Sequence, residues 1–283
     1  MKGPLVSVEW LADNLDRADV KITDASWYLP QMGRDADAEF REGHIPSAVR
    51  FDIERITDTS SGLPHTLAKP DEFAKAVSKL GVTDTDTIVV YDGMGLFSAP
   101  RVWWNFRIMG ADNAMLLDGG LPAWKEAGQP LETGNALPEP ARFVARYDET
   151  RVRDLNDVTA ALRGQEQIVD ARPHDRFTGE TPEPREGMRS GHMPGARSLP
   201  FTELQQDGRL LPPDELRTRF TAAGIDPAQP IIATCGSGVT AATIALAQTV
   251  LGYGEAAFVY DGSWSEWGGR EDTPVETGDG EHS

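Results

Sequence analysis

Short runs of apolar residues alternate along the whole chain with segments of helical pattern. The runs at 20–24, 87–91, 167–170 and 230–234 are rich in Val, Ile and Thr, as expected for buried strands. Between such runs, segments such as 71–80 space their apolar residues three or four positions apart, which is typical of amphipathic helices. This alternation predicts an α/β fold in which parallel sheets are flanked by helices.

The second half of the chain repeats the pattern of the first half. Four matches occur in the same order: Asp24-Ala25 with Asp170-Ala171, 43–48 with 191–196, 87–95 with 230–238, and 117–124 with 260–267. Such ordered repetition indicates a duplication, so the two halves are expected to share one fold. We therefore predict a first domain over 1–134, a linker over 135–150 that contains Pro138 and Pro140, and a second domain over 151–283.

Composition narrows the class of protein and of partner. With 39% hydrophobic residues among 283, the chain has enough apolar surface to build cores. Its net charge of −18 argues against nucleic acid or an anionic membrane as a partner. No apolar stretch is long enough to span a bilayer, and the N-terminus lacks a signal-peptide core. A single cysteine excludes an internal disulfide, which favours a cytoplasmic location, and no metal-ligand spacing or cofactor motif is present.

That cysteine, Cys235, falls between a predicted strand and a predicted alanine-rich helix. The loop Cys235-Gly236-Ser237-Gly238-Val239-Thr240 contains two glycines, which let a tight turn point successive backbone N–H groups at one place. The positive end of the following helix adds to this field. Both effects favour an ionised thiolate, so we expect Cys235 to be an accessible nucleophile rather than an inert core cysteine.

The first half keeps this loop but carries Asp92 where the second half has Cys235. A carboxylate cannot accept a sulfur atom to form a persulfide. We therefore expect the first half to be catalytically silent and to contribute structure, and side chains at an interface, to the second.

Together, these residues resemble the two-domain rhodanese sulfurtransferases. The resemblance rests on the tandem repeat with Cys in the second copy and Asp in the first, on Gly43-His-Ile-Pro-Ser-Ala, and on Tyr260-Asp-Gly-Ser-Trp-Ser-Glu-Trp. It covers almost the whole chain. Within that family, the loop at 235–240 is similar to that of 3-mercaptopyruvate sulfurtransferases, whereas thiosulfate sulfurtransferases typically carry charged residues after the cysteine.

The chemistry of the two donors favours the same choice. Thiosulfate carries its charge close to the transferred sulfur, whereas Gly236 and Ser237 offer no cation there. The carboxylate of 3-mercaptopyruvate lies further from its thiol, and planar guanidinium groups bind carboxylates through paired hydrogen bonds. The resemblance assigns that role to Arg176 and Arg185. The nearby Arg172, Arg189 and Arg197 are expected to be solvated surface residues.

The resemblance also implies a mechanism. Cys235 would take sulfur from 3-mercaptopyruvate as a persulfide while pyruvate leaves, and the backbone N–H groups of 236–240 would hold the charge. Ser237 would transfer a proton together with His65 and Glu54, two residues contributed by the first half of the chain. The outer sulfur would then pass to a thiol, such as that of thioredoxin, or to cyanide.

Other functions compete with this interpretation. Thiosulfate:cyanide sulfurtransfer is the nearest alternative, and donor preference separates the two. A noncatalytic sulfur-carrier or regulatory module would keep Cys235 without needing Arg176, Arg185 and His65. A phosphatase or arsenate reductase of the same ancestry needs an arginine six residues after the cysteine, where this chain has Ala241.

Overall fold

The computed structural model describes residues 3–164 and 166–280, and its chain divides into two compact units. Unit 1 comprises Met1–Asp58, Leu67–Asp148 and Asp207–Leu210. Unit 2 comprises Thr59–Thr66, Glu149–Gln206 and Leu211–Ser283. Each unit therefore incorporates a short segment from the other half of the sequence, a feature that the hydrophobic pattern did not predict.

Each unit is built on one five-stranded sheet in which all neighbouring strands are parallel. In unit 1 the strand order is β1-β5-β4-β2-β3, and in unit 2 it is β6-β12-β11-β7-β8. The strands of unit 1 are β1 Leu5–Val6, β2 Val20–Asp24, β3 Val49–Arg50, β4 Thr87–Tyr91 and β5 Ala114–Leu117. Those of unit 2 are β6 Val152–Arg153, β7 Gln167–Asp170, β8 Arg197–Ser198, β11 Ile231–Thr234 and β12 Ala257–Tyr260. The short strands β9 Gln205–Gln206 and β10 Arg209–Leu210 lie outside these two sheets.

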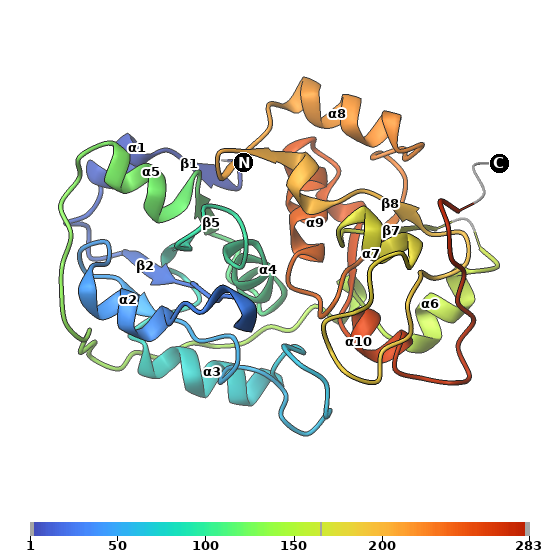
Figure 1. The fold of residues 1–283 in the computed structure, drawn as a ribbon. Helices are drawn as coiled ribbons and strands as arrows, with labels where there is room; N and C mark the ends of the chain where they lie inside the picture. The colour runs from blue at the N-terminus through green and yellow to red at the C-terminus, as the bar shows by residue number, and fades with distance from the viewer. Residues whose placement is uncertain (1–2, 165, 281–283) are drawn as a thin grey trace. The chain divides into compact units, whose positions relative to one another are not determined.

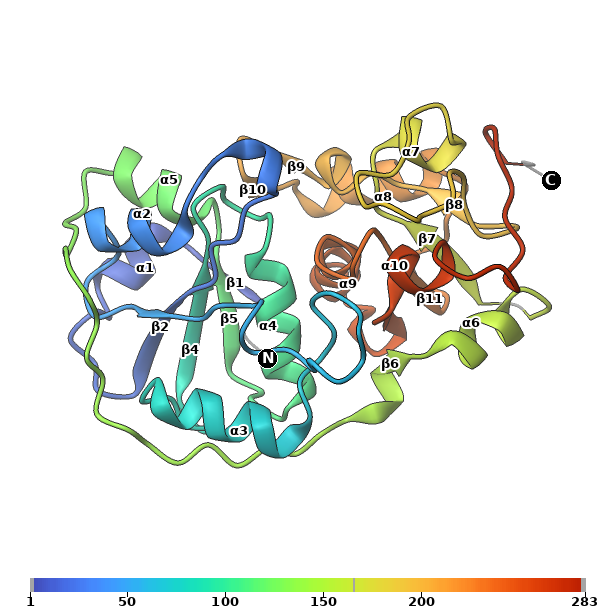
Figure 2. The ribbon, with the colours of Figure 1, turned by 60° about the horizontal axis from the view of Figure 1, so that its bottom comes forward.

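Helices cover the faces of both sheets (Figures 1 and 2). In the first half of the chain they are α1 Val8–Ala12, α2 Ala36–Glu42, α3 Pro70–Lys79, α4 Ala99–Ile108 and α5 Gly120–Glu126. In the second half they are α6 Leu155–Ala161, α7 His174–Thr178, α8 Pro213–Ala222, α9 Ala241–Val250 and α10 Ser263–Trp267. Short 3-10 turns form η1 Pro30–Met32, η2 Glu149–Arg151, η3 Phe201–Leu204 and η4 Gly254–Ala256.

The two sheets have the same topology, which confirms the predicted α/β fold and the duplication. Replacing each strand of unit 1 by its sequence match in unit 2 reproduces the observed order of the second sheet. The central strands β4 and β11 are buried along nearly their whole length, because helices pack on both faces of a parallel sheet. Their continuous apolar runs follow from that burial.

The cores of the two units are also equivalent. In unit 1, Leu11 of α1, Phe40 of α2 and Trp124 of α5 pack with Ile22 and Val89 of the sheet. The matching cluster of unit 2 takes Val158 from α6, Phe177 from α7, Trp264 from α10, and Ile168 and Ile232 from the sheet. Helix α9 is buried from Ala241 to Gln248, which explains why its sequence is apolar on all sides.

The repeated Gly-His-x-Pro turns are fixed in the same way in both units. His44 Nδ1 lies 2.7 Å from the Phe40 carbonyl oxygen, and its ring stacks on Phe40. His192 Nδ1 lies 2.9 Å from the Phe177 carbonyl oxygen, and its ring stacks on Phe177. These histidines therefore secure equivalent turns in the two units.

The segment predicted to be a linker has no helix or strand between 135 and 148, and it packs along unit 1. Ala141 N–H donates to the Ser78 carbonyl, and Phe143 N–H donates to the Ser78 hydroxyl. The Phe143 ring contacts Phe73 and Phe106, and burial of such a ring contributes about 1.5–3 kcal/mol. The segment is thus anchored to one unit.

Candidate active site

Cys235 directly follows β11, the central strand of the unit 2 sheet. The carboxyl end of a parallel strand is where α/β proteins place their sites. The cysteine loop, residues 235–240, then leads into α9 at Ala241. Gly238 has a φ of 77°, a left-handed conformation that glycine adopts without steric cost. The strand, loop and helix therefore form as the sequence predicted.

The start of α10 anchors the cysteine loop. The Cys235 carbonyl accepts from Trp264 N–H at 2.9 Å, and Cys235 N–H donates to the Ser263 hydroxyl at 3.3 Å. The Gly236 carbonyl accepts from both the N–H and the hydroxyl of Ser265, at 2.9 and 2.6 Å. Ser263 itself has a left-handed φ of 48°, so this contact is maintained against backbone strain.

Cys235 is a free cysteine whose residue surface is only 2% exposed, which differs from the accessible thiolate expected from the sequence. The difference arises because all four residues of β11 are buried and the loop is tied down onto α10. The surroundings are nevertheless polar, with Ser237, Ser263 and Ser265 close by in the loop and its anchor. Such exclusion of bulk water strengthens the interaction of N–H dipoles with a charged sulfur.

The aspartate loop of unit 1, residues 92–98, shows which kind of group this cradle holds. The Asp92 carboxylate accepts from the backbone N–H of Met94 at 2.8 Å through one oxygen. Its other oxygen accepts from Phe97, Ser98 and Ala99 at 2.8–2.9 Å. Four backbone donors therefore converge on one anion at the start of α4.

Because the two loops are duplicates, we expect the same arrangement around the Cys235 sulfur. Residues at the same distances from Cys235 are Ser237, Thr240, Ala241 and Ala242. Glycine occupies matching left-handed positions in the two loops, with φ of 110° at Gly95 and 77° at Gly238. A loop of this type provides donors for a negative sulfur, either the thiolate or the persulfide built on it.

Ser237 and His65, both predicted site residues, contact each other inside unit 2. His65 Nδ1 lies 2.9 Å from Ser237 Oγ, and the two residues are 6% and 5% exposed. The segment Thr59–Thr66 groups with unit 2 although it comes from the first half of the sequence. His65 adopts a left-handed φ of 61°. The geometry suits proton transfer between hydroxyl and imidazole.

Glu54, the third predicted member of that group, belongs to unit 1. Its carboxylate accepts from the indole N–H of Trp27 at 3.0 Å. Its participation with His65 and Ser237 stays a prediction.

Arg176 projects from α7 toward the cysteine loop. Its Nη2 lies 3.3 Å from the position that a β-carbon at Gly236 would occupy. The same guanidinium donates through Nε to Glu183 at 3.1 Å, and through Nη2 to the other oxygen of that carboxylate. Glycine at 236 therefore permits the arginine to lie against the loop, and the side chain of Arg176 is 19% exposed.

Arg185, the second predicted substrate arginine, approaches the same point. Its Nη1 lies 3.9 Å from the β-carbon position at Gly236 and donates to the Ser265 hydroxyl at 3.2 Å. Two guanidinium groups thus face the residue that follows the nucleophile. Paired guanidinium groups are suited to a carboxylate ligand.

The expectation that Arg172 is a solvated surface residue was wrong. Its side chain is 1% exposed and lies over Trp264, with 4.2 Å between the guanidinium carbon and the ring centre. It donates to both oxygens of Asp170 and, at 2.6 Å, to Glu183. Charge partners within the loop allow this arginine to be buried, which the sequence spacing alone did not indicate. Burial alone would lower its pKa, but Asp170 and Glu183 raise it overall.

Arg189 and Arg197 are also engaged in the fold. Arg189 donates to the carbonyl oxygens of Trp267, Gly268 and Thr273 at the end of α10. Arg197 donates to the Gln167 side-chain oxygen at 3.1 Å. Neither contact involves the cysteine loop.

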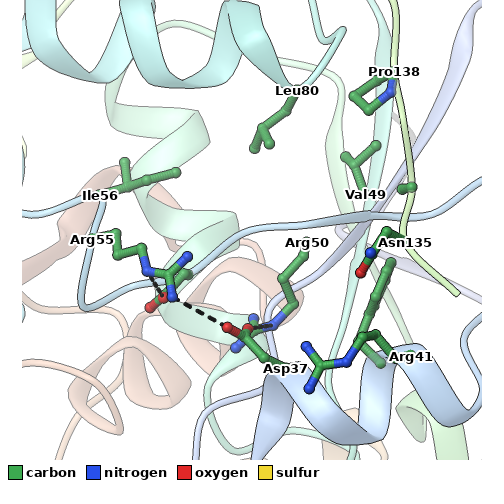
Figure 3. A pocket seen from close by; sticks show the side chains of 12 residues that line it. Asp37, Arg41, Val49, Arg50, Arg55, Ile56, Leu80, Asn135 and Pro138 are labelled. Atoms are coloured by element: carbon green, nitrogen blue, oxygen red, sulfur yellow. Dashed lines mark hydrogen bonds and ion pairs between the residues drawn. The ribbon is translucent and has the colours of Figure 1, made fainter.

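A cavity of about 440 Å³ is lined by residues of unit 1, whereas Cys235 belongs to unit 2. Arg50 and Arg55 both pair with Asp37 there, each at 3.2 Å, as the dashed lines in Figure 3 show. Arg55 also pairs with Asp52 at 3.0 Å. The cavity contains no nucleophile or histidine, and these charges largely neutralise one another, so it is a weaker candidate than the cysteine loop.

Over residues 3–164 and 166–280, no group of His, Cys, Asp or Glu side chains is arranged to hold a metal ion. Within the same described part of the chain, no helix has the length and apolar character needed to cross a membrane.

Sequence reasoning missed three residues of the site. Glu183 joins Arg172 to Arg176, and Ser263 and Ser265 fix the backbone of the cysteine loop. The two serines lie in the repeated motif at 260–267, and the matching positions of the first half are Gly120 and Pro122. This difference between the two copies was a signal that the sequence offered. Glu183 had no comparable signal, because its contacts depend on how the loop after α7 folds back.

A buried cysteine at the carboxyl end of a parallel strand, followed by a glycine-containing loop and faced by two arginines, defines a cysteine-dependent site of an α/β protein. Comparison with known proteins extends this conclusion. The family model described as the Rhodanese-like domain matches residues 7–127 and 154–270. The chain therefore belongs to the rhodanese family, in two tandem copies.

Individual relatives agree over nearly the full length. The chain is 44% identical to 3-mercaptopyruvate sulfurtransferase of Escherichia coli strain K12, covering 96% of this chain and 97% of that protein. It is 42% identical to thiosulfate sulfurtransferase of Cricetulus griseus, covering 93% and 91% respectively. The crystal structure of SseA from Escherichia coli, which has the rhodanese fold, matches with a TM-score of 0.86 and 41% identity, covering 94% of this chain and all of that one.

Proposed function

We propose that this protein is a 3-mercaptopyruvate sulfurtransferase that carries sulfur on Cys235. The observation that carries the proposal is the approach of Arg176 and Arg185 to Gly236, next to the nucleophile. Overall identity does not separate the two donors, since 44% and 42% are nearly equal. The uncharged residues Gly236 and Ser237, with cations set back from the sulfur, favour a keto-acid thiol over thiosulfate.

In the first half-reaction, the Cys235 thiolate attacks the sulfur of 3-mercaptopyruvate. The new S–S bond forms as the C–S bond breaks, and the electron pair of that bond leaves on the enolate of pyruvate. The substrate thiol proton is transferred toward the enolate carbon, and the contact between Ser237 and His65 supports a role for this pair in that transfer. The backbone donors of the loop stabilise the negative charge on the persulfide.

In the second half-reaction, the outer sulfur of the persulfide passes to an external nucleophile. No second thiol exists in the chain to accept it, because Cys235 is the only cysteine. The acceptor that we propose is a small thiol or a protein thiol such as that of thioredoxin, with cyanide as an alternative. A reducing cytoplasm would supply such thiols and keep Cys235 reduced, which supports a cytoplasmic location.

The decisive experiment combines intact mass with kinetics. Incubation with 3-mercaptopyruvate should add one sulfur atom to the protein, and Cys235→Ser should abolish the addition. The ratio of kcat/KM values for 3-mercaptopyruvate and thiosulfate should favour 3-mercaptopyruvate. A preference for thiosulfate would transfer the assignment to thiosulfate:cyanide sulfurtransfer, and failure to load sulfur from either donor would support a noncatalytic sulfur-carrier or regulatory module.

A further inference from the structure

We propose that Glu183 is a positioning residue that fixes the Arg176 guanidinium beside the cysteine loop and so sets the affinity for the sulfur donor. The inference rests on the proposed function, because it concerns how the carboxylate of that donor is bound. Glu183 acts through Arg176.

Glu183 holds Arg176 at two points. Nε of Arg176 donates to Oε1 of Glu183 at 3.1 Å, and Nη2 donates to Oε2. A two-point contact of this kind fixes the plane of the guanidinium as well as its position. The Nη1–Nη2 end is then the part that can fork onto a substrate carboxylate, and Nη2 is the atom nearest the β-carbon position of Gly236.

A buried chain of alternating charges connects this contact to the sheet. Asp170, the last residue of β7, binds Arg172 through both carboxylate oxygens, and Arg172 donates in turn to Glu183 at 2.6 Å. The side chains of Asp170, Arg172 and Glu183 are 1%, 1% and 4% exposed. Buried ion pairs with several hydrogen bonds hold their geometry, so Glu183 is a rigid support.

The same contact recurs in unit 1. Arg34 donates through Nε and Nη2 to the two oxygens of Glu39, at 2.8 and 2.6 Å. Its Nη2 lies 3.4 Å from the β-carbon position of Gly93, which follows Asp92 as Gly236 follows Cys235. In unit 1, however, the Tyr28 hydroxyl contacts this guanidinium at 2.7 Å. Both units thus place an arginine beside the first loop glycine by means of a glutamate.

The test compares Glu183→Gln with Glu180→Gln, an exposed glutamate of the same loop that controls for the loss of one charge. In Glu183→Gln we expect KM for 3-mercaptopyruvate to rise about tenfold or more, the scale of one charge-assisted hydrogen bond, with kcat changed less than about twofold. The rate at which preformed Cys235 persulfide passes sulfur to cyanide should not change. In Glu180→Gln every parameter should stay at the wild-type value.

Glu183→Asp separates position from charge. It keeps the carboxylate but shortens the arm by one methylene, so KM should still rise if geometry is what matters. Wild-type KM in both Glu183→Gln and Glu183→Asp would overturn the proposal. An equal loss in both half-reactions, accompanied by a lower melting temperature, would also overturn it, since that is the signature of a merely structural residue. If Glu183→Gln does not fold, the KM of Glu183→Asp decides alone.

Failure of the proposed function would look different. The wild-type protein would then form no persulfide from 3-mercaptopyruvate, and no KM for this donor would be measurable in any variant.

Discussion

Arg172 and Arg176 stand four residues apart and have the same side chain, yet the fold uses them differently. Arg172 is enclosed by Asp170, Glu183 and Trp264, so its guanidinium binds groups of the protein itself. Arg176 is held along one edge by Glu183 and presents its other end to the cysteine loop. The identity of a residue therefore predicts the kind of contact it makes, and its neighbours decide whether that contact is with the protein or with a ligand.

Arg185→Ala tests the second arginine. Because Arg185 is expected to bind the donor carboxylate, its loss should raise KM for 3-mercaptopyruvate by an amount equivalent to about 1.5–3 kcal/mol. Steady-state kinetics with this donor measures the change, and transfer of sulfur from preformed persulfide to cyanide is the internal control. An unchanged KM together with an unchanged kcat would remove Arg185 from the site.

At the scale of elements, the predicted linker is a strap fixed to unit 1, and one ion pair contributes to that attachment. Arg146 Nη1 lies 2.6 Å from Asp84 Oδ2, and Val144 N–H donates to Asp84 Oδ1 at 3.2 Å. Burial alone would raise the pKa of Asp84, but the hydrogen bonds from Arg146 and Val144 lower it overall. A carboxyl whose pKa is lowered by folding stabilises the native state only while it is ionised.

Acid should therefore loosen this attachment. Stability from Asp84 is present above its unfolded pKa of 3.8 and is lost as the pH falls through the lower pKa of the folded state. Asp84→Asn should reduce the free energy of unfolding at pH 7 by less than about 1 kcal/mol, because Arg146 is largely exposed. Urea unfolding at neutral pH and below pH 4, on either side of the ordinary pKa of an aspartate, measures the difference in unfolding free energy between Asp84→Asn and the wild type. A destabilisation that persists undiminished in acid would contradict the argument.

Much of each element was predictable from local sequence. Apolar runs predicted the strands β2, β4, β7 and β11, and the glycine positions predicted the cysteine loop. These features depend only on residues close together in the sequence. The contact between His65 and Ser237 spans 172 positions and followed only from family resemblance. Glu183, the burial of Arg172 and the 2% exposure of Cys235 could not be predicted, because they depend on how loops fold back onto the sheet.

At the scale of the whole molecule, both units contain the duplicated loop, but only the loop of unit 2 carries a cysteine. Unit 1 keeps the backbone donors, yet it uses them to bind its own Asp92 carboxylate. The Tyr28 hydroxyl and the backbone of Gly208 also lie against Gly93 and Gly95 of the same loop. We therefore expect that backbone donors alone do not make a unit catalytic, and that space for a donor beside the loop is also needed.

Asp92→Cys combined with Cys235→Ser tests this point. The new thiol would sit in a matching loop, but Tyr28 and Gly208 leave no room for a donor beside Gly93 and Gly95. We expect no sulfur to be added by 3-mercaptopyruvate, as measured by intact mass against Cys235→Ser alone. Addition of one sulfur atom to the double variant would show that backbone donors and a thiol are sufficient.

The grouping of Thr59–Thr66 with unit 2 and of Asp207–Leu210 with unit 1 limits how the gene for such a protein can be divided. A fragment beginning at Glu149 would retain Cys235, Arg176 and Arg185 but would lack His65, which is encoded in the other piece. Because each unit contains a segment encoded in the other half of the sequence, separating the two halves into two chains would remove a segment from both units. We therefore expect the duplicated protein to be maintained as a single polypeptide.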